Sequence, residues 1–457
     1  MYHWITIDPD QHRFLRTVAD ALGVATLRVF AEPSVQATDF CRTQCAGLVT
    51  ATGVVDGRQV AVVWSDFRVG AASYGQANSR RFVAFLQELD RTGTSVPLLY
   101  FVNSAGLSLM EGRRVFADAF ALWPALLDYS SRNPYFTCAL GKCLGLAPLL
   151  FGLGVYRVAV AGQTQLNLAG PEVISLFFGE KIDFAASAAA ERFESRNDLI
   201  HEIVPSVTEA CRRFRGLLSA RRAPVREVVR GAATATATLL ARFLDAPAQE
   251  VVPGWCERVR LFLGTRRGRP LGLFVNPPDR SNNMVTTRTL DKYAAGLDLF
   301  RALGVPVVSF LDSPGIDPRF EQSDANNFRR MLAVGERIIR YPHGAMGVVT
   351  RRCYGGSATL SFPKVFGGRR MVALRGSSFG AMHESIITRI LGGSPRLLAQ
   401  WSEVAAHQGP GLEDLLENGS VDAIVDPADL GFEIDRFLFQ PADVRPVMPT
   451  LDLRRAG

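Results

Sequence analysis

The sequence predicts an α/β protein built from two tandem domains that are related by internal duplication. The chain has 457 residues, which is more than one hydrophobic core ordinarily serves. Apolar strands alternate with helical patterns along it, as they do in proteins made of βα units. Segments from the first half also recur in the second half in the same order, which indicates a repeated unit.

Three pairs of segments carry the repeat, and each pair is separated by 209 to 211 residues. The pairs are Gly57–Val63 with Gly268–Phe274, Val96–Leu107 with Val305–Ile316, and Lys142–Ala147 with Arg352–Ser357. Similar βα turns recur in any α/β protein, but chance recurrence does not produce one shared spacing. We therefore interpret the pairs as equivalent positions in two copies of one fold.

The repeats and the helical patterns between them suggest domain boundaries. Apolar residues at helical spacing predict helices over Ser79–Leu89 and Leu290–Leu303. The expected organisation is a helical or irregular leader over residues 1–50, a first domain over 51–215, a helical connection over 216–255 and a second domain over 256–457.

Composition excludes several classes of protein. The net charge of +7 comes without a basic run interleaved with aromatics, so we expect no nucleic-acid binding. Seven cysteines, an odd and scattered set, predict a reducing cytoplasm and no disulfide framework. Cys41 and Cys45 lack a second pair at ligand spacing, so no metal site is expected. The apolar stretch Cys138–Ala161 includes Lys142 and Arg157 and predicts a buried strand and helix; no membrane association is expected.

The candidate chemistry lies in turns that follow the repeated strands. The four turns are Asn103–Leu107, Cys143–Ala147, Asp312–Ile316 and Cys353–Ser357. Two such turns that face each other can direct backbone N–H groups at one oxygen and stabilise an oxyanion or enolate. The alternative is that the glycines only permit tight turns. His201, His343 and His383 each lack a neighbouring residue at a spacing that is typical of catalytic pairs. No side chain is therefore identified as an acid or base.

Six segments, between roughly residues 50 and 430, resemble motifs of the carboxyltransferase β subunits of biotin-dependent acyl-CoA carboxylases, the propionyl-CoA carboxylase type. The segments are Asn103–Gly112 for D-S-G-G-A-R-x-x-E-G, Gly141–Ala147 for G-P-C-x-G-G-A, Ala169–Ile174 for T-G-P-x-V-I, Phe274–Pro278 for V-A-N-Q-P, Asp312–Ile316 for D-x-P-G-F and Thr350–Ser357 for T-R-K-x-Y-G-G-A. The resemblance implies two crotonase-like domains, each a ββα spiral.

The resemblance also implies a reaction and a site. Carboxyl transfer between carboxybiotin and an acyl-CoA or acyl carrier protein thioester would use backbone oxyanion holes and no metal. By position, the catalytic amides would be those of Gly145, Leu146, Gly356 and Ser357. The substrate-binding positions would be Ala105, Gly106, Leu107, Cys143, Ala147, Pro314, Gly315, Tyr354, Gly355 and Thr359.

Partners follow from the same resemblance. Biotin carboxylase and the biotin carboxyl carrier protein would be separate chains, and the subunit would form a homo-oligomer, from dimer to hexamer, or pair with a paralogue. The first half departs from the family motifs, with Ala105 for glycine, Ser108 for arginine, Lys142 for proline and Leu146 for glycine. These departures keep two alternatives open: a biotin-independent decarboxylase or related enolate enzyme, and a non-catalytic subunit.

Overall fold

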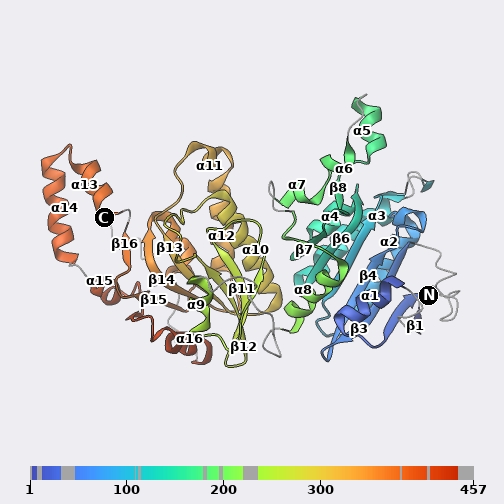
Figure 1. Cartoon of the computed structure of the whole chain (residues 1–457), viewed down its shortest axis with the longest axis horizontal. Coiled ribbons are helices and arrows are strands. Elements are labelled where there is room, and N and C mark those ends of the chain that lie inside the picture. The colour runs from blue at the N-terminus through green and yellow to red at the C-terminus, as the bar shows by residue number, and fades with distance from the viewer. Residues whose placement is uncertain are drawn as a thin grey trace, which may run out of the picture. The chain divides into compact units, whose positions relative to one another are not determined.

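The computed structural model describes residues 3–7, 13–31, 47–108, 110–111, 115–178, 183–194, 199–219, 235–380, 383–408 and 412–440. The chain divides into two compact units, residues 1–219 and 220–457. Each unit contains one mixed sheet with helices packed against it (Figure 1). The predicted α/β fold with two tandem domains is thereby confirmed.

The first unit alternates strands and helices from its N-terminus onward. Its elements are β1 His3–Ile7, α1 Arg13–Leu22, β2 Leu27–Ala31, β3 Leu48–Val55, β4 Arg58–Ser65, α2 Gln76–Asp90, β5 Leu98–Ser104, α3 Val115–Arg132, β6 Tyr135–Leu144, α4 Ala147–Gly152, β7 Tyr156–Val160, β8 Gln165–Asn167, α5 Pro171–Phe178, α6 Phe184–Ser187, α7 Ala190–Glu194, β9 Glu202–Val204 and α8 Val207–Ser219.

The second unit repeats much of this order. Its elements are α9 Ala235–Ala241, β10 Gln249–Val251, β11 Arg260–Arg266, β12 Arg269–Val275, α10 Thr287–Leu303, β13 Val307–Ser313, α11 Phe320–Asp324, α12 Asn327–Ile339, β14 Ala345–Tyr354, β15 Arg370–Leu374, β16 Ser378–Gly380, α13 Glu384–Leu391, α14 Pro395–Gln408, α15 Glu413–Glu417, β17 Ala423–Val425 and α16 Leu430–Phe439. The helices predicted over Ser79–Leu89 and Leu290–Leu303 lie within α2 and α10.

The strand orders of the two sheets match. The first sheet runs β1-β2-β3-β4-β5-β6-β7-β9 with β8 on β6, and the second runs β10-β11-β12-β13-β14-β15-β17 with β16 on β14. From β4 and β12 onward the neighbouring strands are parallel. In both units the helix between the second and third of these parallel strands, α3 or α11 with α12, makes the crossover that parallel pairing requires.

One irregularity recurs at the same point in both sheets. Val102 pairs with Ala139 and Ser104 with Cys143, so β6 carries two residues more than β5 over this interval. Leu311 pairs with Val349 and Ser313 with Cys353, which gives β14 the same excess over β13. Beyond the bulge, β6 pairs with β8 and β14 pairs with β16. The bulge therefore turns the last three residues of each strand onto a new partner.

Each sheet is covered on both faces, which is why its strands are apolar throughout. In the first unit, α2 and α3 bury Phe82, Phe85 and Leu122 against one face. On the other face Phe14 of α1 stacks on Trp64, with ring centroids 4.3 Å apart, and Phe214 of α8 stacks on Phe136 at 5.7 Å. This core fixes the carboxyl ends of β5 and β6, where the glycine turns begin.

In the second unit the two faces are covered in the same way. Phe274 of β12 stacks on Tyr293 of α10 with ring centroids 4.7 Å apart, and Phe310 of β13 stacks on Phe243 beyond α9 at 5.3 Å. Helix α16 adds Ile434 and Phe437 to the second of these clusters.

The segment expected as a leader supplies strands to the first sheet. β1 pairs with β2, and β2 pairs with β3 through Arg28 with Thr52 and Val29 with Ala51. Short antiparallel pairs of this kind are favoured at a sheet edge because each new strand satisfies the free N–H and C=O groups of the last. Within the expected helical connection, β10 pairs with β11 in the second sheet; residues 220–234 lie outside the described ranges.

The apolar stretch Cys138–Ala161 forms most of β6, then α4 and β7, as predicted. None of the helices that the structure describes combines the length and the apolar character that a membrane span requires. Cys41 and Cys45 lie outside the described residues.

Candidate active site

The first glycine turn follows β5. The N–H of Tyr74 donates to Gly106 O at 2.8 Å, and the N–H of Ser108 donates to Tyr74 O at 3.3 Å. The N–H of Gly106 donates to Ser104 Oγ at 3.1 Å. Between these bonds, the N–H of Leu107 has no acceptor among the described residues. Gly106 has φ +98°, a value that residues with a Cβ rarely adopt.

The second turn follows β6 and lies against the first. Gly145, with φ +61°, donates its N–H to Asn167 O at 3.1 Å. Leu146 caps the N-terminus of α4, where amides have no intrahelical acceptor, and its N–H finds none elsewhere in the described chain. Its side chain is buried in the core of the first unit, so the leucine at this position does not fill the space in front of the turn.

The same two turns occur in the second unit. The N–H of Val285 donates to Gly315 O at 2.9 Å, and the N–H of Asp317 donates to Val285 O at 2.9 Å. The N–H of Ile316 between them is unpaired within the described ranges. Gly356 lies in the first turn of the 3₁₀ helix Gly355–Ser361, where its N–H likewise has no acceptor in the helix.

Counting only bonds among the described residues, each unit therefore presents one unpaired amide after its β5-type strand and another after its β6-type strand. These are Leu107 and Leu146 in the first unit, and Ile316 and Gly356 in the second. The sequence-based set contains three of them but omits Ile316. The signal that could have identified Ile316 is its place in the repeat, since the aligned segments Val96–Leu107 and Val305–Ile316 pair it with Leu107.

The two other residues predicted as catalytic, Gly145 and Ser357, each donate a hydrogen bond within or next to their turn. Gly145 already donates its N–H to Asn167. Ser357 is buried, and its hydroxyl donates to Tyr354 O at 2.7 Å. Both residues hold the turns in position through these bonds. Gly355 and Gly356 are exposed, so the second-unit turn is open to solvent.

The predicted substrate-binding residues fall into two groups. Those at or near the surface of the turns are Ala105, Leu107, Pro314, Gly315, Gly355 and Thr359. Those that are buried are Gly106, Cys143, Ala147 and Tyr354. The ring of Tyr354 meets that of His383 edge-on, with centroids 5.8 Å apart.

Neither His201 nor the thiols of Cys143 and Cys353 supply a strong base. Burial lowers the pKa of His201 well below its usual value, because the charged imidazolium is poorly solvated there. Burial raises the pKa of Cys143, and it raises that of Cys353 to about 12, so both thiols stay protonated near neutral pH. No cluster of His, Cys, Asp and Glu that could hold a metal ion occurs in the described part of the chain. The candidate site is thus made of backbone donors.

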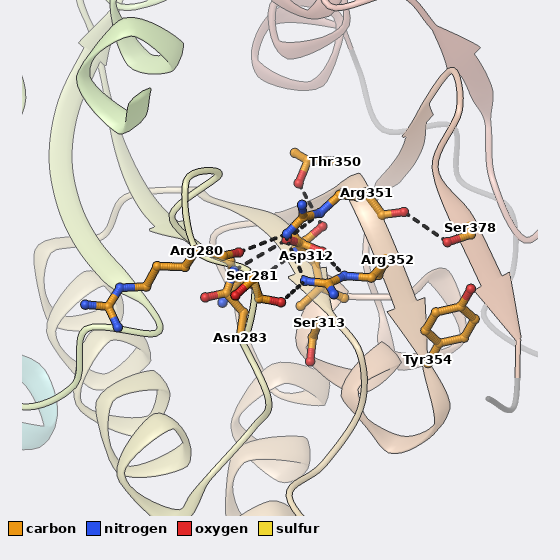
Figure 2. A network of polar contacts seen from close by, with 12 residues as sticks. Arg280, Ser281, Asn283, Asp312, Ser313, Thr350, Arg351, Arg352, Tyr354 and Ser378 are labelled. Atoms are coloured by element: carbon orange, nitrogen blue, oxygen red, sulfur yellow. Dashed lines mark hydrogen bonds and ion pairs between the residues drawn. The ribbon is translucent and has the colours of Figure 1, made fainter. Parts of the chain in front are cut away.

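A charged cluster lies next to the second-unit turns (Figure 2). The Asp312 carboxylate at the end of β13 accepts hydrogen bonds from Arg351 and Arg352 of β14. Burial raises the pKa of Asp312, but hydrogen bonds from Arg352 and Arg351 outweigh that effect and hold the pKa below its usual value. The carboxylate is therefore ionised and already paired, which does not suit it to act as a base.

The chain is similar to known carboxyl transferases. Residues 27–236 match the carboxyl transferase domain family. The β6 subunit of a biotin-dependent acetyl-/propionyl-coenzyme A carboxylase from Mycobacterium tuberculosis is 25% identical over 447 residues, covering 86% of this chain and 89% of that protein. The propionyl-CoA carboxylase β chain of Saccharopolyspora erythraea is 24% identical over 449 residues, covering 88% and 82%.

Solved structures share the fold. The transcarboxylase 12S hexamer structure with methylmalonyl-coenzyme A bound matches with a TM-score of 0.74 and 21% identity, covering 89% of this chain and 84% of that chain. A single-chain, multi-domain long-chain acyl-CoA carboxylase matches with a TM-score of 0.73 and 18% identity, covering 92% of this chain and 45% of that chain. The chain is therefore a distant homologue of the carboxyltransferase β subunits of biotin-dependent acyl-CoA carboxylases.

Proposed function

We propose that this chain is a carboxyltransferase subunit that moves a carboxyl group between carboxybiotin, on a separate carrier protein, and the α-carbon of an acyl-CoA or acyl carrier protein thioester. The observation that carries the proposal is the pair of unpaired amides repeated in each unit. Such a transfer develops negative charge on two oxygens, that of the thioester enolate and that of the biotin ureido group. Two donor pairs match this requirement.

The residues present fit groups that must approach a backbone closely. Gly106 and Gly145 leave little room for a Cβ, and Gly356 is exposed. The backbone N–H groups of Leu107 with Leu146, and of Ile316 with Gly356, would each hold one oxygen. Because the turns are fixed by hydrogen bonds in the free protein, the donors need little reorganisation when charge develops.

Carboxybiotin would supply the carboxyl group and, as free biotin, the basic ureido nitrogen that takes the α-proton. This assignment agrees with the state of the groups described beside the turns, where the Cys143 and Cys353 thiols are protonated and Asp312 is paired. The chain itself would then bind and orient the thioester and the biotin group and polarise their carbonyl oxygens. We further propose biotin carboxylase and biotin carrier on separate chains and assembly as an oligomer.

The test uses the purified chain with malonyl-CoA or methylmalonyl-CoA labelled in the free carboxyl group. We expect label to move to biotin only when a biotinylated carrier protein is added. Release of labelled carbon dioxide without biotin would instead establish a decarboxylase. No turnover by the chain alone, with turnover restored by a paralogous subunit that binds it, would establish a non-catalytic role.

A glycine pair provides the matched control. The variant Gly356→Val places a β-branched side chain where a Cβ would lie 2.6 Å from Ile316 Cδ1. Gly393, in the same unit, has an ordinary φ, and a Cβ added there would meet no atom within 4 Å. We expect Gly356→Val to abolish transfer and Gly393→Val to leave it intact.

A further inference from the structure

One carboxylate joins three chain segments at the second-unit site. Asp312 accepts from Arg351 Nε at 3.0 Å and Nη2 at 2.5 Å, and from Arg352 Nε at 2.7 Å and Nη2 at 3.2 Å. The two arginines also donate to Arg280 O and Ser281 O, each at 2.9 Å. Figure 2 shows both guanidinium groups converging on the single carboxylate. The cluster thus ties the ends of β13 and β14 to the loop after β12.

The bulge in β14 explains how two consecutive residues reach one partner. On a regular strand, side chains of neighbouring residues point to opposite faces of the sheet. Arg351 and Arg352 lie in the interval between Val349 and Cys353, where β14 has two residues more than β13. The bulge breaks the alternation there and lets both side chains turn toward Asp312.

The first unit has the same bulge without the charges. Asn103 stands at the position equivalent to Asp312, and Gly141 and Lys142 stand at those of Arg351 and Arg352. Asn103 Oδ1 accepts only the backbone N–H of Lys142, at 3.0 Å, among the described bonds. The two units therefore hold equivalent turns by different means: backbone contact in the first and an ion cluster in the second.

We propose that Asp312 is a positioning residue, which holds the two turns of the second unit so that the Ile316 and Gly356 amides point at a common oxygen. Ile316 lies four residues after Asp312, and Gly356 lies four residues after Arg352, so movement of either strand end moves a donor. The side chain of Asp312 is only 2% exposed, so its carboxylate is held in one position. The inference rests on the proposed function, because it assigns those amides a shared oxygen.

The proposal predicts a specific kinetic and dynamic signature for Asp312→Asn. The amide keeps the size of the side chain but not its charge, so the two arginines lose their ionic partner. The Ile316 and Gly356 amides are then no longer held toward a common oxygen. Because these donors act on charge that develops in the transition state, kcat should fall about 10- to 100-fold with KM within about twofold. Hydrogen exchange at the Val285 and Asp317 amides, which close the turn, should become faster.

Asp435 offers a control of the same chemistry. Its carboxylate, on α16, also binds two consecutive arginines, accepting from Arg266 Nη2 at 2.7 Å and Arg267 Nη2 at 2.9 Å. Asp435→Asn therefore removes an equivalent ion cluster from the same unit, away from the glycine turns. It should leave kcat and the exchange of Val285 and Asp317 unchanged. The Tyr74 and Ser108 amides of the first unit serve as an internal reference in every variant.

Kinetics and exchange are measured together, on the full chain with its carrier protein. Unchanged kcat and exchange in Asp312→Asn, or equal losses in Asp435→Asn, would overturn the proposal. A wild-type chain without carboxyl transfer would refute the proposed function, while faster exchange at Val285 and Asp317 alone would still establish Asp312 as the anchor of the turn. If Asp312→Asn does not fold, Arg351→Gln removes only the more exposed arginine and should show the same pattern at smaller size.

Discussion

Gly106 and Gly145 meet backbone to backbone. A Cβ on Gly106 would lie 3.1 Å from the Cα of Gly145, and a Cβ on Gly145 would lie 3.2 Å from the Cα of Gly106. The contact brings together the two turns that carry the Leu107 and Leu146 amides. Any side chain at either position must separate them, so the first-unit site should tolerate no substitution at these glycines.

We therefore expect Gly106→Ala to lower carboxyl transfer about 10²- to 10³-fold, the effect of losing an oxyanion donor. Its Cβ would lie 2.9 Å from Leu144 O, a backbone atom that cannot move aside alone. With the strain of the positive φ, unfolding free energy should fall by about 1–3 kcal/mol. Steady-state rates and chemical denaturation measure the two effects.

The variant Gly162→Ala separates the strain of a positive φ from the steric contact of an added Cβ. Gly162 has φ +65° in the same unit but no atom within 4 Å of an added Cβ. It should lose some stability and keep full activity. Equal activity losses in both variants would show that the contact with Gly145 is not what matters.

In the second unit, Gly356 and Ile316 should be coupled. Gly356→Ala would place a Cβ 2.6 Å from Ile316 Cδ1, so activity should fall, whereas Ile316→Val removes that Cδ1 and should be mild. The double variant should recover most of the activity, with a coupling free energy of about 0.5–3 kcal/mol in a double-mutant cycle on kcat/KM. Strictly additive effects would mean that the side chain of Ile316 does not restrict this turn.

The buried thiols should be inert. Cys143 is fully buried and Cys353 is 2% exposed, and burial raises the pKa of both thiols, so little reactive thiolate forms. Treatment of the native protein with iodoacetamide near pH 8 should leave both unmodified and activity unchanged, as judged by peptide mass spectrometry. The denatured protein should react at both. Modification of native Cys143 with loss of activity would indicate an accessible site at this position.

Lys292 predicts a pH-dependent stability. Its ammonium is fully buried and donates to Cys256 O at 2.9 Å, and burial lowers the pKa of this lysine to about 8 from its ordinary 10.5. Between these values the unfolded chain retains a proton that the folded chain has released. The contribution of Lys292 to stability therefore rises with pH across this window.

Lys292→Met cannot titrate and provides the reference. The unfolding free energy of the wild type relative to this variant should increase by on the order of 3 kcal/mol in total from about pH 8 to above pH 10, measured by urea denaturation. Most of the rise should be visible by about pH 9.5. A difference that stays constant with pH would show that Lys292 keeps its proton in the folded state.

The fold was accessible from the sequence because its signals are local. Apolar runs bounded by glycine, such as the one that ends at Gly106, mark strands and turns directly, and the repeat at Gly315 confirms them. The strands before residue 32 were not accessible, since five-residue edge strands such as Leu27–Ala31 acquire their pattern only from the neighbour they pair with.

The site was accessible only in part. Glycine turns are visible in a sequence, but an unpaired N–H is a property of which bonds the chain makes. Asn167, which accepts from Gly145, lies 22 residues away, and no local pattern reveals that choice. The convergence of Arg351 and Arg352 was hidden for a similar reason, since a regular strand would have separated them.

The shared bulge has a consequence for engineering. β6 already has the two-residue excess that lets consecutive side chains turn toward one partner. The first unit therefore has the backbone geometry for an ion cluster but lacks the charged side chains. Replacing Asn103, Gly141 and Lys142 with aspartate and two arginines would transplant the anchor of the second unit without altering the chain trace. A Cβ at residue 141 would lie 2.8 Å from Oδ1 of residue 103, an atom that aspartate retains, so the new carboxylate must rotate away from residue 141.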